Sequence, residues 1–126
     1  MDKKMEINAK ELALKAAKML DERLARELSV IDVSGVTEIA EYFVIATGTS
    51  STHVKALCDE VEFKLKQEGI VPDHIEGHNA KNWIVMDYSC VVVHIFDIEA
   101  RNYYDLERLW ADGKKLELNF SEEETK

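Results

Sequence analysis

The sequence is poor in cysteine and proline and has no long apolar run, and these shortages limit what the chain can be. Its two cysteines, Cys58 and Cys90, lie far apart and fit no metal-binding or redox spacing. Each lies in an apolar pattern, so we expect reduced core thiols in a cytoplasmic protein. Charged residues interrupt positions 1–20 every few residues, and we therefore expect neither a signal peptide nor a membrane span.

Basic residues are also in the minority. The chain has 25 acidic and 16 basic side chains, which give a formal net charge of -9. A nucleic-acid backbone repels such a chain on average, so we expect no direct, sequence-specific binding to nucleic acid. The charge instead favours a protein as the partner.

The length of 126 residues indicates a single domain, which we expect over residues 1–120. Residues 121–126 are polar, and three of the six are glutamates, so we expect them to form a disordered acidic tail. The whole chain after Gly113 is expected to be mobile or to be used only in an assembly. Three apolar residues before the tail nevertheless alternate as in a weak strand: Leu116, Leu118 and Phe120.

The first predicted element is an amphipathic helix. Asn8 is suited to cap its start, with Glu11 three residues later as the reciprocal acceptor. Ile7 and Leu12 are placed to form a hydrophobic staple beside this cap. A short strand is predicted over residues 28–33, and the segment that follows it is ambiguous.

A second strand and a second helix come next, joined by a turn rich in glycine and serine. The strand covers residues 42–47 and the turn covers residues 48–51. Gly69 is well placed to end the helix. The inward positions expected for this helix are Val54, Leu57, Cys58, Val61 and Leu65.

The segment that begins at Trp83 reads as a strand with two different faces. Trp83, Val85 and Asp87 fall on one face of this strand. Ile84 and Met86 fall on the other, so one side is buried and the other presents a large aromatic ring and a carboxylate. Such a strand is typical of a surface that binds a partner.

A hairpin and a final helix complete the predicted fold. The apolar run over residues 91–96 indicates a strand that is covered on both faces. Asp97 is expected to cap the helix that follows. Strands separated by helices, together with one hairpin, indicate the α/β class, with helices flanking a single mixed β-sheet.

The turn from Gly48 to His53 is a candidate phosphate site, because backbone N–H groups at a helix N-terminus favour an anion. The lysine and spacing of a P-loop are absent, and so is the G-x-G-x-x-G pattern. No aspartate pair follows the turn to hold two cations, since Asp32 and Asp87 are isolated on separate segments. A nucleotide-binding or nucleotidyltransferase-like enzyme that uses this turn is kept as the alternative hypothesis. Because these motifs are absent, we expect no catalytic residue and no cofactor.

Four histidines raise the question of a metal site. His74 and His78 have the spacing that places two ligands on one helix face, but Pro72 and Gly77 disfavour a helix there. His94, within an apolar strand, is typical of a hydrogen-bonded interior histidine. We therefore expect no metal site.

Aromatic and acidic residues form the better constellation, because Trp and Tyr most often anchor protein interfaces. On a continuous final helix, Tyr103, Leu106 and Trp110 share one face, which we assign to packing. Tyr104 and Glu107 then face away and are available to a partner. The alternative, that several of these aromatic side chains belong to the core, stays open.

The same residues carry a resemblance to a known family. The spacing from Glu76 and Gly77 to Trp83, the Val-Val-His after the hairpin and the segment RNYYDLERLW at 101–110 resemble the Iojap family, the ribosomal silencing factors. The segment 42–54, YFVIATGTSSTHV, matches the other block of that family. The resemblance covers residues 9–112.

This resemblance implies a nucleotidyltransferase-like fold without the catalytic carboxylates, and a protein that is not an enzyme. It also implies a partner, the fourteenth protein of the large ribosomal subunit (uL14), whose surface forms a bridge to the small subunit. Occupying that bridge would block subunit joining and repress translation. A homodimer of the free protein is plausible for this family.

Resemblance and residue chemistry together suggest which side chains bind the partner. Trp83 is expected as the central anchor and Tyr104 as a second one, while the acidic residues set orientation by pairing with lysine or arginine. The chain departs from the family at Ser89 and Cys90, where a glycine and an acidic residue are usual. The expected partner-binding residues are Trp83, Tyr104, Asp87, Glu76, Glu107 and Tyr88.

Overall fold

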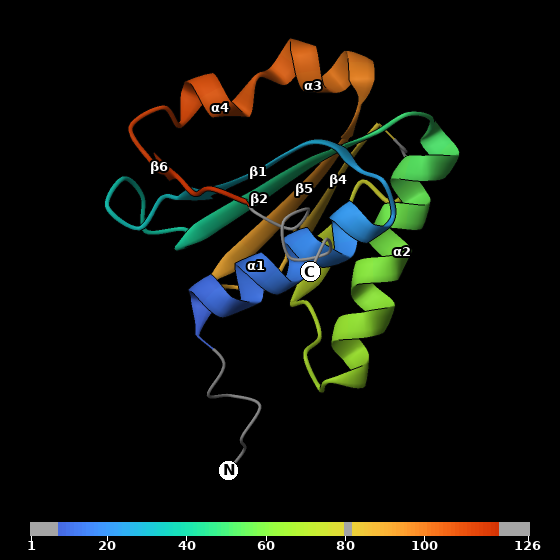
Figure 1. The fold of residues 1–126 in the computed structure, drawn as a ribbon, viewed down its shortest axis with the longest axis horizontal. Coiled ribbons are helices and arrows are strands. Elements are labelled where there is room, and N and C mark those ends of the chain that lie inside the picture. The colour runs from blue at the N-terminus through green and yellow to red at the C-terminus, as the bar shows by residue number, and fades with distance from the viewer. Residues whose placement is uncertain (1–7, 80–81, 119–126) are drawn as a thin grey trace, which may run out of the picture.

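Residues 8–79 and 82–118 are described by the computed structural model, and they form a six-stranded sheet with helices on both faces (Figure 1). None of the helices in this described part is long and apolar enough to span a bilayer. The elements in chain order are α1 (Ala9–Glu22), β1 (Arg26–Asp32), β2 (Tyr42–Gly48), α2 (Ser51–Gln67), β3 (His74–Glu76), β4 (Trp83–Asp87), β5 (Val91–Asp97), α3 (Ile98–Tyr104), α4 (Leu106–Leu109) and β6 (Lys114–Lys115).

The sheet is mixed, with the strand order β3-β4-β5-β2-β1-β6. β2 and β5 run parallel at its centre, and every other neighbouring pair is antiparallel. Figure 1 shows α1 and α2 together on one face, with α3 and α4 crossing the other. The predicted α/β class with a mixed sheet and flanking helices is confirmed.

The main core lies between the sheet and the α1–α2 layer. Ile84 and Met86 of β4 point into it and are fully buried, as the alternation along that strand predicts. The inward positions predicted for α2 are fully buried too, so the apolar stripe of that helix is confirmed. A smaller cluster lies on the opposite face, where α3 and α4 cover part of the sheet.

The predicted helix ends are confirmed where they are described. The Asn8 side chain accepts a hydrogen bond from the Glu11 backbone N–H at 2.8 Å, and Asp97 accepts one from Ala100 at the same distance. Gly69 follows the C-cap of α2 in the left-handed region, with φ 82°. The expected staple cannot be described in the same way, because Ile7 lies outside the described residues.

The chain after Gly113 is the main correction to the predicted fold. Lys115 pairs with Ile31 of β1, and the next residue, Leu116, donates a backbone hydrogen bond to Val30 at 2.9 Å. The alternating side chains of Leu116 and Leu118 pack on the core, which explains why residues 114–118 hold a fixed place against β1. The expectation of mobility is wrong for them, while Phe120 and the tail 121–126 lie outside the described residues.

Candidate partner-binding surface

The sheet face opposite α1 and α2 is only partly covered. α3 packs against β5 and β2, and the outward side chains of β3 and β4 stay half-buried or exposed. The antiparallel register pairs Glu76 with Val85, so residues of both strands share this face. We call the half-buried and exposed side chains gathered here the Trp83 surface. It consists of Glu76, Trp83, Val85, Asp87 and Tyr104.

Trp83 is held in place from several sides, although it is only half-buried. Its ring centroid lies 4.4 Å from that of Tyr104 and 5.1 Å from that of Phe96. Its indole N–H donates to Nδ1 of His94 at 3.2 Å. A fixed aromatic ring loses little conformational entropy when a partner covers it, so Trp83 has the properties of an interface anchor.

His94 is the hydrogen-bond partner of Trp83 within the sheet. The side chain is 8% exposed, and burial lowers its pKa to about 4, which keeps the ring neutral. Since Nδ1 accepts the indole hydrogen bond, the proton of the neutral ring is on Nε2. Sequence reasoning identified His94 as interior but missed this contact. The contact could have been found from the hairpin register, which pairs His94 with Val85, because Val85 and Trp83 share one face of β4.

Carboxylates border the aromatic part of the surface. Glu76 Oε2 lies 3.3 Å from His74 Nε2, and Asp87 Oδ2 lies 3.9 Å from the same nitrogen. Asp87 also accepts the Ser89 backbone N–H at 2.8 Å, and Asp73 accepts the Ser89 hydroxyl at 2.6 Å. The structure therefore brings Asp73, which the sequence did not single out, to the acidic rim beside Glu76 and Asp87.

Ser89 itself adopts φ 73°, a conformation that favours glycine. This is the hairpin position at which the resemblance noted in the sequence led us to expect a glycine.

Tyr88 does not belong to this surface. It is 7% exposed and packs in the core between the sheet and α2. Tyr88 is buried because side chains alternate along the strand, and Tyr88 continues the inward series of Ile84 and Met86 beyond the end of β4. Burial raises the pKa of its hydroxyl, which has no hydrogen-bond partner among the described residues. The expectation that Tyr88 is available to a partner is wrong.

The final helix is broken, which changes the faces predicted for it. Asp105 adopts a left-handed conformation, with φ 46° and ψ 55°, between α3 and α4. Tyr103 is consequently 81% exposed, so its assignment to packing is wrong, whereas Leu106 is buried and Trp110 packs edge-on against Phe43. Tyr104 is 42% exposed and stays accessible beside Trp83.

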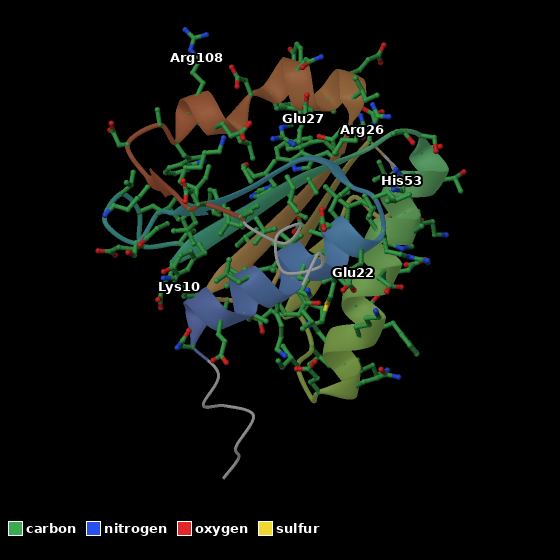
Figure 2. All side chains as sticks on the ribbon, viewed as in Figure 1. Lys10, Glu22, Arg26, Glu27, His53 and Arg108 are labelled. Carbon is green, nitrogen blue, oxygen red and sulfur yellow. The ribbon has the colours of Figure 1, made fainter. Side chains whose placement is uncertain are left out.

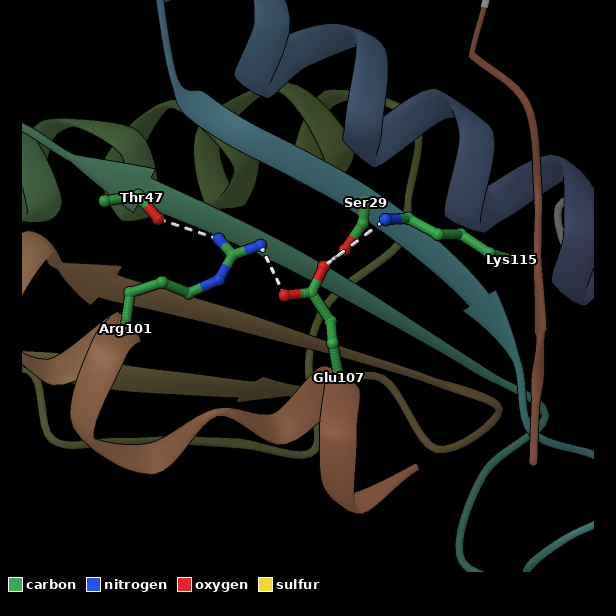
Figure 3. Close-up of polar contacts among 5 residues, drawn as sticks. All are labelled: Ser29, Thr47, Arg101, Glu107 and Lys115. Carbon is green, nitrogen blue, oxygen red and sulfur yellow. Dashed lines mark hydrogen bonds and ion pairs between the residues drawn. The ribbon is translucent and has the colours of Figure 1, made fainter. Parts of the chain in front are cut away.

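Glu107 points toward the sheet, contrary to the expected orientation (Figure 3). It accepts hydrogen bonds from Ser29 at 2.7 Å and from Arg101 at 3.0 Å, and Lys115 Nζ lies 3.7 Å away. Arg101 in turn donates to the Thr47 hydroxyl at 2.7 Å. The break at Asp105 turns α4 so that this carboxylate ties α3 and α4 to β1, β2 and β6.

The electrostatics of Glu107 follow from these contacts. Partial burial acts to raise its pKa, but the hydrogen bonds from Ser29 and Arg101 and the charges of Arg101 and Lys115 outweigh burial. The net pKa lies below the ordinary value of a glutamate. Sequence reasoning missed Arg101, Ser29 and Thr47 as partners. Arg108, on the other side of α4, points away from the sheet (Figure 2).

The turn from Gly48 to His53 is committed to internal contacts. The Ser50 hydroxyl accepts the His53 backbone N–H at 3.1 Å, and His53 Nδ1 accepts the Thr49 N–H at 2.9 Å. His53 Nε2 then donates to the Arg23 carbonyl at 2.8 Å, joining the first turn of α2 to the end of α1 (Figure 2). These contacts explain why the turn has serine and histidine: it starts α2 and connects that helix to the end of α1.

Comparison with known proteins adds a family to this geometry. The family described as "Ribosomal silencing factor during starvation" matches residues 6–126. Ribosomal silencing factor RsfS of Bacillus subtilis is 33% identical, covering 90% of this chain and 97% of its own length. The protein of that name from Chromobacterium violaceum is 36% identical, covering 82% and 85%. A mouse relative, named mitochondrial assembly of ribosomal large subunit protein 1, is 33% identical over 73% of this chain and 42% of its own length.

Solved structures agree with the sequence relatives. A crystal structure of a protein from Chromobacterium violaceum superposes with a TM-score of 0.80 at 33% identity, covering 88% of this chain and 92% of that one. One from Bacillus halodurans gives a TM-score of 0.75 at 31% identity, covering 88% and 100%. Sequence and fold together show that this chain belongs to the ribosomal silencing factor family.

Proposed function

We propose that this chain binds the large ribosomal subunit through uL14, blocks the approach of the small subunit and so represses translation. The observation that carries the proposal is the Trp83 surface, a fixed aromatic centre with an acidic rim on a member of the ribosomal silencing factor family. The name of the mouse relative, which refers to assembly of the ribosomal large subunit, agrees with this choice of particle.

The chemistry of the surface fits a basic protein partner better than RNA. Trp83 and Tyr104 offer rigid aromatic area, and a standard interface buries roughly 800 Å² on each partner. Glu76 and Asp87 would steer lysine and arginine side chains into register. The net charge of -9 opposes contact with exposed phosphates on average, which favours docking on protein.

The other two expected contact residues take different places in this proposal. Glu107 does not contact the partner in this proposal. Its hydrogen bonds to Ser29 and Arg101 hold α3, which carries Tyr104, against the sheet. Tyr88 is a core residue and makes no contact with the partner.

The test is Trp83→Glu in co-sedimentation with purified large subunits. We expect binding to weaken by more than tenfold, or about 1.4 kcal/mol, because a carboxylate replaces the aromatic anchor and adds charge to the acidic rim. Phe63→Glu is the matched control: Phe63 is 61% exposed on α2, on the far side of the sheet, and its replacement should leave binding unchanged. Circular dichroism and thermal unfolding establish that both variants are folded.

Equal binding by folded Trp83→Glu and the parent chain would contradict the proposed surface. Equal weakening by Phe63→Glu would show instead that added negative charge, and not loss of the anchor, reduces binding.

A further inference from the structure

We propose that Cys58, Asp59 and His78 form a binding site for a zinc-like divalent metal ion. Within residues 8–79 and 82–118 they are the one group of three such side chains whose donor atoms all lie within 4.8 Å of one another. Thiolate, carboxylate and imidazole are the three donor types that zinc prefers in proteins. This inference does not depend on the proposed ribosomal function.

The three donors come from two segments that the fold brings together. Cys58 and Asp59 are consecutive residues of α2, whereas His78 follows β3 directly after Gly77. Gly77 has φ 81°, and a Cβ atom there would collide with the Trp83 carbonyl oxygen. The close passage of the backbone along β4 therefore fixes where His78 lies relative to α2.

Two of the donors already have the spacing of ligands in a tetrahedral site, and in the metal-free chain they form a hydrogen bond and ion pair. His78 Nε2 lies 3.3 Å from Asp59 Oδ1, and two ligands at zinc distances are separated by about 3.3 Å. The Cys58 sulfur lies no more than 4.8 Å from either of them and would need to approach by about 1 Å, as zinc–sulfur distances of roughly 2.3 Å require. Since Asp59 is exposed and His78 half-buried, these two can move to meet the buried sulfur.

Two of the three donors lie toward solvent. Cys58 is buried, whereas Asp59 is exposed and His78 is half-buried. Three protein ligands leave a fourth position that water can fill. Bound metal would join α2 to the segment that leads into Trp83.

Binding must displace a proton, because burial raises the pKa of the Cys58 thiol to about 12. The thiol proton passes to solvent as the sulfur–metal bond forms.

Cobalt titration of the reduced full chain tests the site, because a cobalt–thiolate bond gives a charge-transfer band in the near ultraviolet. We expect this band, and we expect zinc to displace it. Cys58→Ala and His78→Ala should abolish the band, whereas Cys90→Ala, which alters the other cysteine, should keep it. Zinc affinity measured against a chelator should fall at least tenfold in Asp59→Asn, whose exposed side chain can be changed without disturbing the core.

Absence of the band in the folded parent chain would overturn the proposal. So would a band that survives in Cys58→Ala, or a zinc affinity that does not change in Asp59→Asn and His78→Ala. Thermal unfolding without metal identifies any variant that fails to fold, and Asp59→Asn then decides the question.

Discussion

Trp83 can serve as an anchor because of the residues that hold it, and His94 is the most informative of these at the residue scale. The buried imidazole accepts the indole hydrogen bond, with the two rings tilted by 35° and their centroids 6.1 Å apart. The same burial lowers the pKa of His94 and so couples its titration to folding.

We predict that stability depends on the protonation of His94. Its pKa is about 4 in the folded chain and has an ordinary value of 6.5, so the unfolded chain binds the proton more readily. The contribution is fully present above pH 6.5 and is lost as the pH falls toward 4, with a slope of up to about 1.4 kcal/mol per pH unit. Urea unfolding at several pH values measures this slope.

His94→Gln removes the titrating group while keeping a side chain that can accept the indole hydrogen bond. The variant should show a smaller loss of unfolding free energy between pH 6.5 and 4 than the parent chain. An identical slope in both proteins would mean that His94 does not titrate differently on folding.

At the scale of elements, the α3–α4 segment is held by one polar network. Asp105 breaks the helix, and the turned α4 directs Glu107 to Ser29 of β1 and Arg101 of α3 (Figure 3). Arg101 is itself buried, so its charge depends on Glu107 and Thr47 for compensation.

Glu107→Gln should lower the free energy of unfolding by about 1–3 kcal/mol, because the buried Arg101 loses its charged partner. The folded pKa of Glu107 is below its ordinary value of 4.5, so its contribution is present above that pH and is lost as the pH falls through the folded pKa. The variant should therefore lose less stability on acidification than the parent chain. Glu38→Gln, at an exposed loop position, is the control and should match the parent chain in urea unfolding. Equal stability of all three proteins at neutral pH would contradict this role of the network.

The elements also show what the sequence could and could not reveal. The caps at Asn8 and Asp97 and the faces of β4 were predictable, because they depend on residues a few positions apart. Glu107 and Ser29 are 78 positions apart, so no local pattern announces their hydrogen bond. The break at Asp105 is not visible in the helical pattern either, because a left-handed residue other than glycine is uncommon.

In the candidate site, too, local patterns predict some residues and not others. Alternation along β4 predicts the outer positions of Trp83 and Asp87, whereas the expectation that Tyr88 faces a partner is wrong because it lies just beyond the strand. Residues 114–118 were misjudged because their order comes from β1, a distant segment, and not from their own composition.

At the scale of the whole molecule, the proposed mechanism depends on bulk and charge. The Trp83 surface lies at the β3–β4 end of one face of the sheet. α1 and α2 form a layer on the opposite face (Figure 1). A domain docked by that surface would therefore carry this bulk outward from uL14, into space that the small subunit enters. If the free chain pairs with a second copy through the same surface, that pair must separate before docking.

The most direct test of this account is light scattering from purified large and small subunits mixed in magnesium, with the chain added first. We predict loss of the association signal at near-stoichiometric amounts, and its recovery when excess free uL14 is added. Trp83→Glu should leave association largely intact at the same concentration. An unchanged signal in the presence of parent chain that is demonstrably bound to the large subunit would contradict steric silencing, because it would place the docking site away from the bridge.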